Sequence, residues 1–242
     1  MKLIAQTIII AALTTGAGQT FAKPLPVNNI YGIETQDRHL SGFSAVSVAG
    51  SFDVYITQGG SESVKVEADD DVINNIITEV KGGVLKIYTK NQGFNWNWGD
   101  KKRVVHVTAK NLNAISLSGS GDVFFKDGIR AQSLALSLSG SGDITGKVEV
   151  TNLTSSIVGS GDITVIGRAE TSTSKVSGSG DFTAKGLLTT NSIVKVVGSG
   201  DAVVNASQKV DAAVTGSGDI RYTGGAKQIS TSKTGSGDIS RY

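Results

Sequence analysis

Apolar and polar positions alternate through most of the chain in short runs rich in Val, Ile, Ser and Thr, and the pattern returns about every 19 residues. Each repeat is marked by the tetrapeptide Gly-Ser-Gly-Asp. An apolar residue stands two positions before the first Gly in six of seven copies, and another follows the Asp in all seven. Because side chains alternate along an extended strand, these positions predict an inward face shared by all repeats.

A repeat of this length predicts a solenoid built from strands. It is too short for two helices, and its composition favours extended backbone, so each repeat is expected to form one turn of a parallel coil. The rule for parallel crossovers makes the coil right-handed. We therefore expect an all-β protein, a right-handed single-stranded parallel β-helix with a coil period of about 19 residues and irregular N-terminal coils.

The motif itself allows two backbone paths. If the strand runs straight through it, both glycines face inward and thin the coil where opposite walls approach. If the backbone bends there, glycine supplies a corner with positive φ. In either case the glycines have a structural role.

The Asp residues of the motif are expected to form a column with a spacing of about 4.8 Å. Adjacent carboxylates at that distance repel each other by about 1 kcal/mol in water. Hydrogen bonds from turn amides would relieve this, and so would a bound cation such as calcium. Calcium β-rolls use two motifs per coil, whereas this chain has one, so we predict a structural turn column with no metal and no cofactor: Asp122, Asp143, Asp162, Asp181, Asp201, Asp219 and Asp238.

The first residues have the pattern of a secretory signal peptide. Lys2 precedes a short apolar stretch, and Thr20-Phe21-Ala22 forms a small-x-small cleavage site. The apolar stretch is too short to span a bilayer, and the chain contains no cysteine for lipid attachment. We expect an exported protein, periplasmic, at the cell surface or secreted, with no transmembrane segment after signal cleavage.

The domain organisation follows from where the repeat is regular. We predict a signal peptide at 1–22, a flexible leader at 23–40 and a single β-helix domain at 41–242, irregular over 41–111 and regular over 112–242.

Within the irregular part, Gly50-Ser-Phe-Asp53 is a relic of the motif, and strands are expected at 84–88 and 104–108. Apolar residues at three- and four-residue steps over 69–80 predict a short amphipathic helix or a loop anchored by those residues.

The order of these blocks resembles the head GIN domain family, also called auto-transporter adhesin domains. The resemblance rests on residues 43–59, 64–68 and 82–87 followed by the Gly-Ser-Gly-Asp coils, and it covers roughly 41–242. It implies an exported β-helical domain with an adhesin-like role, and it supplies no catalytic residues.

Composition argues against several other functions. The chain carries 23 basic and 21 acidic residues, and the basic residues are not gathered on one face, so no nucleic-acid partner is expected. His39 and His106 are its two histidines, and no carboxylate cluster interrupts the regular coils. We predict a non-catalytic binding or structural protein; the alternatives are a carbohydrate-active β-helix enzyme, a lyase or hydrolase, and a calcium-stabilised structural roll.

One segment differs from the scaffold, because residues 91–103 hold both tryptophans, a phenylalanine and a basic cluster. Such a surface stacks on sugar rings or anchors a protein, so an envelope glycan or a surface protein is the expected partner. The alternative is that the aromatic residues cap the end or flank of the coil. The candidate binding residues are Phe94, Trp96, Trp98, Lys101, Lys102 and Arg103.

The last repeat has Lys233 where the others have an apolar residue. Polar substitution is typical of a terminal coil, whose strand edge is open to pairing with another chain. Two outcomes are therefore expected for this edge. It can pair with another copy to form a homo-oligomer through the C-terminal coil edge, or its charge can keep it solvated.

Overall fold

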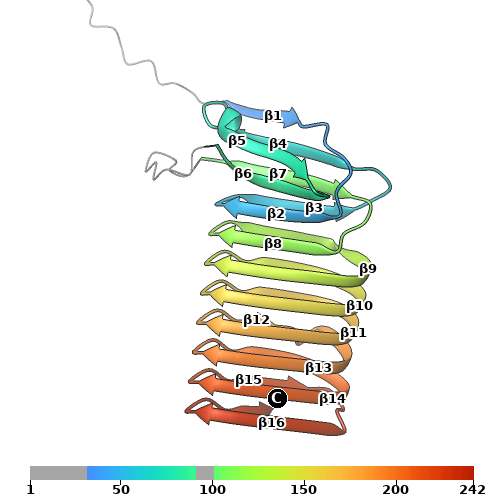
Figure 1. Ribbon diagram of the computed structural model, residues 1–242, viewed down its shortest axis with the longest axis vertical. Coiled ribbons are helices and arrows are strands. Elements are labelled where there is room, and N and C mark those ends of the chain that lie inside the picture. Colours follow the sequence, from blue (N-terminus) through green and yellow to red (C-terminus); the bar gives the residue numbers. More distant parts are fainter. Residues whose placement is uncertain (1–31, 91–100) are drawn as a thin grey trace, which may run out of the picture. The chain divides into compact units, whose positions relative to one another are not determined.

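The computed structural model describes residues 32–90 and 101–242, all within one compact unit, Tyr31–Tyr242. These residues form a β-solenoid of about seven turns with a period of about 19 residues, which confirms the predicted fold class (Figure 1). The predictions for the signal peptide, for most of the leader and for Phe94, Trp96 and Trp98 concern residues outside the described ones.

Each regular coil contributes one strand segment to each of two walls, and stacked coils pair in parallel. Ile157 of one coil lies beside Val176 of the next, and Gly159 lies beside Gly178. The strands of these coils are β9 (Asp122–Gly140), β10 (Ile144–Gly159), β11 (Ile163–Gly178), β12 (Phe182–Thr183), β13 (Leu187–Gly198), β14 (Ala202–Gly216), β15 (Ile220–Thr223), β16 (Gln228–Gly235) and β17 (Ile239–Arg241).

The predicted inward positions do form the core. The residues two positions before the motif are buried in the first six regular copies, as are those that follow the Asp. The last coil differs, because every residue of β16 is exposed, including Ile229 and Lys233 at inward positions. The apolar pattern therefore tracks the core until the final coil.

The backbone bends at the motif, which decides between the two paths that the sequence allowed. Strands end at the first glycine and resume at or just after the Asp, and the first glycine has φ between 113° and 137° in all seven copies. This left-handed backbone favours glycine. The second glycine faces inward, where a Cβ would overlap the main chain of the preceding coil in six of the seven copies and, at Gly121, that of Phe52.

The N-terminal block continues both walls with shorter strands. Its parallel members are β2 (Ala45–Gly50), β3 (Asp53–Gln58), β6 (Val84–Thr89), β7 (Arg103–Ala109) and β8 (Ala114–Gly119). In space β6 and β7 lie beyond β2 and β3, although they come later in the chain. Gly50 pairs with Gly119 and has a φ of 132°, so the predicted relic is a true copy of the corner.

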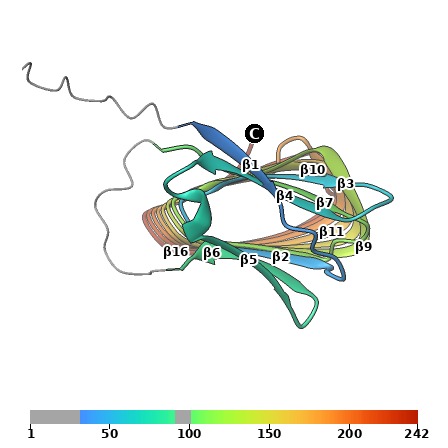
Figure 2. The ribbon, with the colours of Figure 1, turned by 90° about the horizontal axis from the view of Figure 1, so that it is seen from above.

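Antiparallel strands close this end of the solenoid (Figure 2). On one wall β4 (Ser63–Asp69) pairs with β7, and β1 (Ile33–Asp37) pairs with β4. On the other wall β5 (Ile76–Lys81) pairs with β6. A change of strand direction ends the parallel stacking, so further coils cannot be added there in the same register.

Two expectations for this block need correction. A short amphipathic helix or an anchored loop was expected over 69–80; the segment instead forms a turn, the short 3₁₀ helix η1 (Ile73–Asn75) and strand β5, with Val72, Ile73 and Ile76 buried. Gly82 and Gly83, with φ of 60° and 75°, form a tight turn that lets β5 pair with β6 along its whole length, which satisfies more backbone groups than a short helix would. The leader predicted at 23–40 is likewise too long, because residues 33–37 form β1 in the sheet.

Candidate functional site

The motif corner is a hydrogen-bonded column. In each coil the Asp Oδ1 accepts the main-chain N–H of the Asp in the next coil, with N···O distances of 2.7–3.0 Å. Hydrogen bonds of a main-chain donor to a carboxylate are stronger than those between neutral groups, and they offset the repulsion between neighbouring charges. The residues so joined are Asp122, Asp143, Asp162, Asp181, Asp201, Asp219 and Asp238.

Asp53 stands at the head of this column, in register with Asp122. Partial burial raises the pKa of the Asp53 carboxyl, and the nearby charge of Asp122 raises it further. A hydrogen bond from the Asp122 main chain and the charge of Arg103 lower it in part, so that the pKa remains raised. Across residues 32–90 and 101–242, no three His, Cys, Asp or Glu side chains come together to hold a metal ion. The geometry of the column is that of a structural corner.

The described basic residues of the predicted binding segment lie beside acidic residues of the N-terminal block. Lys101 forms an ion pair with Asp71, and Lys102 Nζ lies 2.7 Å from Glu67 Oε1. The hydrogen bond from Lys102 lowers the pKa of Glu67. Arg103 is half-buried as the first residue of β7. These contacts fasten the C-terminal flank of the segment to β4 and to the turn before η1.

Strand pairing also fixes the place of this segment in the coil. Ala49 pairs with Tyr88 and Asp53 pairs with Val104, so β6 ends and β7 begins at the side where other coils have the motif corner. In the sequence residues 90–102 separate these two strands, whereas two or three residues separate the strands at a regular corner. Long connections on a rigid scaffold are where binding residues concentrate.

Three aromatic side chains from different strands stack on the outer wall, an arrangement that the sequence analysis missed. The Tyr55 ring lies 5.5 Å from His106 and 5.2 Å from Phe124, and both pairs are stacked. Lys126 Nζ lies 5.4 Å from the Phe124 ring centroid. Since the rings cover one another's faces, this ladder stabilises the stack and offers mainly ring edges to solvent.

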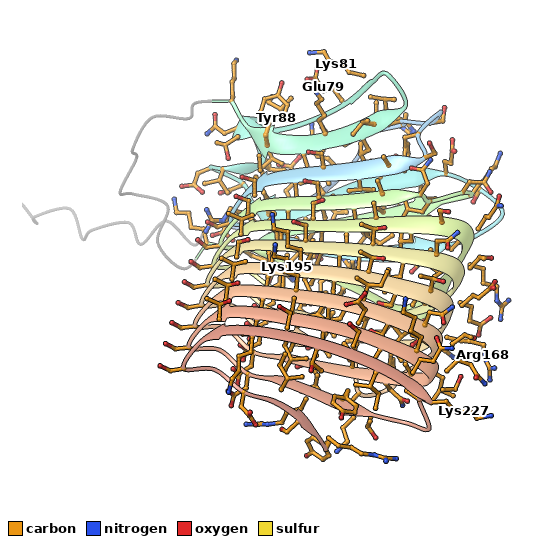
Figure 3. The ribbon with its side chains drawn as sticks, turned by 60° about the horizontal axis from the view of Figure 1, so that its bottom comes forward. Glu79, Lys81, Tyr88, Arg168, Lys195 and Lys227 are labelled. Atoms are coloured by element: carbon orange, nitrogen blue, oxygen red, sulfur yellow. The ribbon has the colours of Figure 1, made fainter. Side chains whose placement is uncertain are left out.

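A groove follows the corner opposite the motif, on the side where Arg168 projects from the solenoid (Figure 3). Its main hollow, of about 560 Å³, is lined by β9, β10 and β11 and includes Glu149, Thr151 and Arg168. A second hollow of about 460 Å³ adjoins it and extends over β13 and β14, and a smaller one of about 150 Å³ lies toward β3. The two larger volumes fall in the range of ordinary ligand sites.

Polar contacts hold one end of this groove. Arg130 Nε donates to Glu149 Oε2 at 2.7 Å, a contact that lowers the pKa of Glu149. The Gln58 side chain accepts the Arg130 main-chain N–H at 2.7 Å and donates to its carbonyl at 3.0 Å. Within the described part of the chain, the Arg168 guanidinium has no hydrogen bond and no ion pair, although it borders both larger hollows.

No curated protein matches the sequence. Among the described residues, no helix has the length and apolar character needed to cross a membrane.

Solved structures with the same fold come from Bacteroides and Parabacteroides species. A putative adhesin from Bacteroides fragilis aligns with a TM-score of 0.83 and 26% identity over 87% of this chain and 97% of its own. A putative lipid binding protein from Parabacteroides distasonis aligns with a TM-score of 0.71 and 27% identity over 87% and 96%. A putative adhesin from the same organism has a TM-score of 0.70, with 24% identity over 88% and 98%, and shows the fold alone.

The sequence profile of one family covers most of the β-solenoid. That family is described as putative auto-transporter adhesin, head GIN domain, and its profile matches residues 42–226. The match spans the relic of the motif, the antiparallel strands β4 and β5 and the coils through β15, in the order on which the resemblance rested. The chain therefore belongs to the head GIN domain family.

Proposed function

We propose that this chain is a non-catalytic, adhesin-like binding domain that works outside the cytoplasm, in the periplasm, on the cell surface or after secretion. The observation that carries the proposal is the engagement of the repeated carboxylates. Each is bound to a main-chain amide of the next coil, from Asp122 through Asp219. Glycosidases need a pair of carboxylates free to exchange protons or attack the sugar, so a carboxylate held in the scaffold serves the fold instead.

Family membership and the names of the solved relatives support the same function. A binding domain benefits from a rigid body that holds a few variable surfaces in fixed positions. We take two parts of this chain for that role, the connection between β6 and β7 and the groove opposite the motif.

For the first surface, we propose that residues 94–103 bind an envelope glycan or a surface protein. The Trp96→Ala, Trp98→Ala double variant should bind envelope preparations at least about tenfold more weakly than the parent, because aromatic anchors carry a large share of binding energy. A matched control is Tyr242→Ala, which removes an aromatic side chain that is 64% exposed in the last coil.

The measurement is retention of the purified protein on immobilised cell-envelope fractions, with thermal melting in parallel. A double variant that binds like the parent would overturn the assignment of the site. One that unfolds would assign the tryptophans to a cap. Release of reducing ends or unsaturated uronates from polysaccharides by the parent protein would instead establish the alternative of a carbohydrate-active enzyme.

A further inference from the structure

The two ends of each coil obey different constraints. At the motif corner every coil repeats the same four residues, and the pairing is unbroken from Gly119 to Gly235. The irregularities in register lie on the other side, between Gly146 and Val148 and between Thr189 and Asn191. Coil length and side chains therefore vary at the opposite corner. Stacking does not require the same residues there in every coil, so these residues can differ to suit a function.

The hollows at that corner join into one groove parallel to the solenoid axis. The two larger hollows share Val150, Thr151 and Arg168, and the smallest shares Glu149 with the main one. From β9 to β14 the groove crosses four steps between stacked coils, a length of about 19 Å at 4.8 Å a step. It is long enough to hold several units of a linear polymer.

The groove offers hydrogen-bonding groups of both kinds without a net charge. Thr190, Asn205 and Ser207 add neutral polar groups at one end, and the exposed side chain of Leu188 lies among them. Its floor includes the buried side chains of Val150 and Ala169. The charged residues that line it are three basic and three acidic: Arg130, Lys147, Arg168, Asp127, Glu149 and Glu170.

This balance identifies a class of ligand. Because three basic and three acidic side chains line the groove, neither a polyanion nor a polycation gains a net electrostatic attraction to it. A chain of sugar hydroxyls can donate to carboxylates and accept from guanidinium and amide groups, while its C–H surfaces contact a small apolar floor. Among the described residues, none forms a hydrogen bond or ion pair with the Arg168 guanidinium, so no such contact is broken when a ligand binds there.

We propose that the groove binds an extended, uncharged polysaccharide laid along the solenoid axis, with Arg168 and Glu170 as its central hydrogen-bonding residues. The inference rests on the proposed role as a binding domain and adds a second surface, separate from residues 94–103. Both side chains are exposed, so replacing them leaves the core intact.

The test is binding of the purified protein to an array of neutral and acidic glycans, followed by titration calorimetry with the best neutral one. Arg168→Ala and Glu170→Ala should each weaken binding about tenfold, since hydrogen bonds to charged groups contribute at that level. The control, Lys195→Ala, removes a positive charge from an exposed position of β13 outside the groove and should bind like the parent (Figure 3).

The effect of Glu170→Ala separates the possible ligands. Tighter binding after removal of this carboxylate, or a preference for acidic glycans, would show that the ligand is anionic and overturn the proposed class. If Arg168→Ala bound with the affinity of the parent, or if no neutral glycan bound at all, the groove would not be the binding site. Envelope binding lost only in the tryptophan variant would then still support the proposed function.

Discussion

The strongest prediction concerns the inner glycine of the motif, for which Gly161→Ala is the test. A Cβ at this position would overlap the carbonyl oxygen of Gly142 in the preceding coil, and its three nearest atoms are all backbone atoms of that residue. The corner cannot easily yield, because Gly161 N–H is bonded to Gly140 O at 3.1 Å and Ser160 N–H to the same oxygen at 2.9 Å. The added methyl group must therefore push the two coils apart.

The cost follows from the hydrogen bonds that this separation stretches. Two are the bonds to Gly140 O, and a third, from Asp162 N–H to Asp143 Oδ1 at 3.0 Å, crosses the same interface. At about 1 kcal/mol each, their loss or distortion predicts a decrease of about 3 kcal/mol in the free energy of unfolding. For a domain of this size the melting temperature should fall by about 6–12 °C.

Thermal and urea unfolding followed by circular dichroism provide the measurement. Gly225→Ala is the matched control, because no atom lies within 4 Å of its added Cβ and its backbone is not left-handed. It should melt within a degree or two of the parent. If Gly161→Ala melted as the control does, the corner would not be sterically closed and the account of the repeated glycines would be wrong.

Three further predictions test the column and the edge. Asp162→Asn keeps an acceptor for the N–H of Asp181 and removes a charge, so its stability should equal or slightly exceed that of the parent. If a chelator lowered the melting temperature of the parent protein by many degrees, that result would instead support the calcium roll. Because the pKa of Asp53 is raised in the folded protein, its ionised form is destabilising above that pKa. Asp53→Asn should therefore be slightly more stable than the parent at neutral pH, by less than about 1 kcal/mol, and the difference should vanish below the ordinary value of 3.8; a difference independent of pH would contradict this. Lys233 places a charge at an inward position of the exposed strand β16, 3.8 Å from Asp238, and such charges oppose edge pairing. Lys233→Ile should raise the dimer fraction in sedimentation experiments, and an unchanged monomer would exclude this edge as a route to oligomers.

The solenoid could be predicted because one local pattern meets the same constraints in every coil. Ile157 and Val176 are buried by equivalent neighbours, so the sequence repeats where the structure repeats. The relic Gly50-Ser-Phe-Asp53 could also be predicted from the sequence. Phe52 stands where the later copies of the motif have their second glycine, and its side chain is buried. Its neighbour Asp53 pairs with Asp122 of the first complete motif.

The N-terminal block was harder to predict because its stacking order is not its chain order. β6 and β7 lie beyond β2 and β3, and the antiparallel strands depend on pairing between distant segments. One local signal was missed. Gly82-Gly83 between two β-rich runs is a hairpin signature, and it outweighed the three- and four-residue spacing that suggested a helix.

By itself the sequence determined the coil period and the inward face, because both are set by interactions repeated at a fixed spacing, and the order of its motifs indicated the family. That the backbone bends at the motif was decided by the structure. The tertiary structure alone decided which outward side chains meet. Tyr55, His106 and Phe124 stack although they are far apart in the chain. Glu149 and Arg168 lie side by side on neighbouring coils, and Glu170 follows two residues later, so the three line one groove only once the coils stack. Outward positions carry no repeated constraint, so their partners are fixed only when the coils stack.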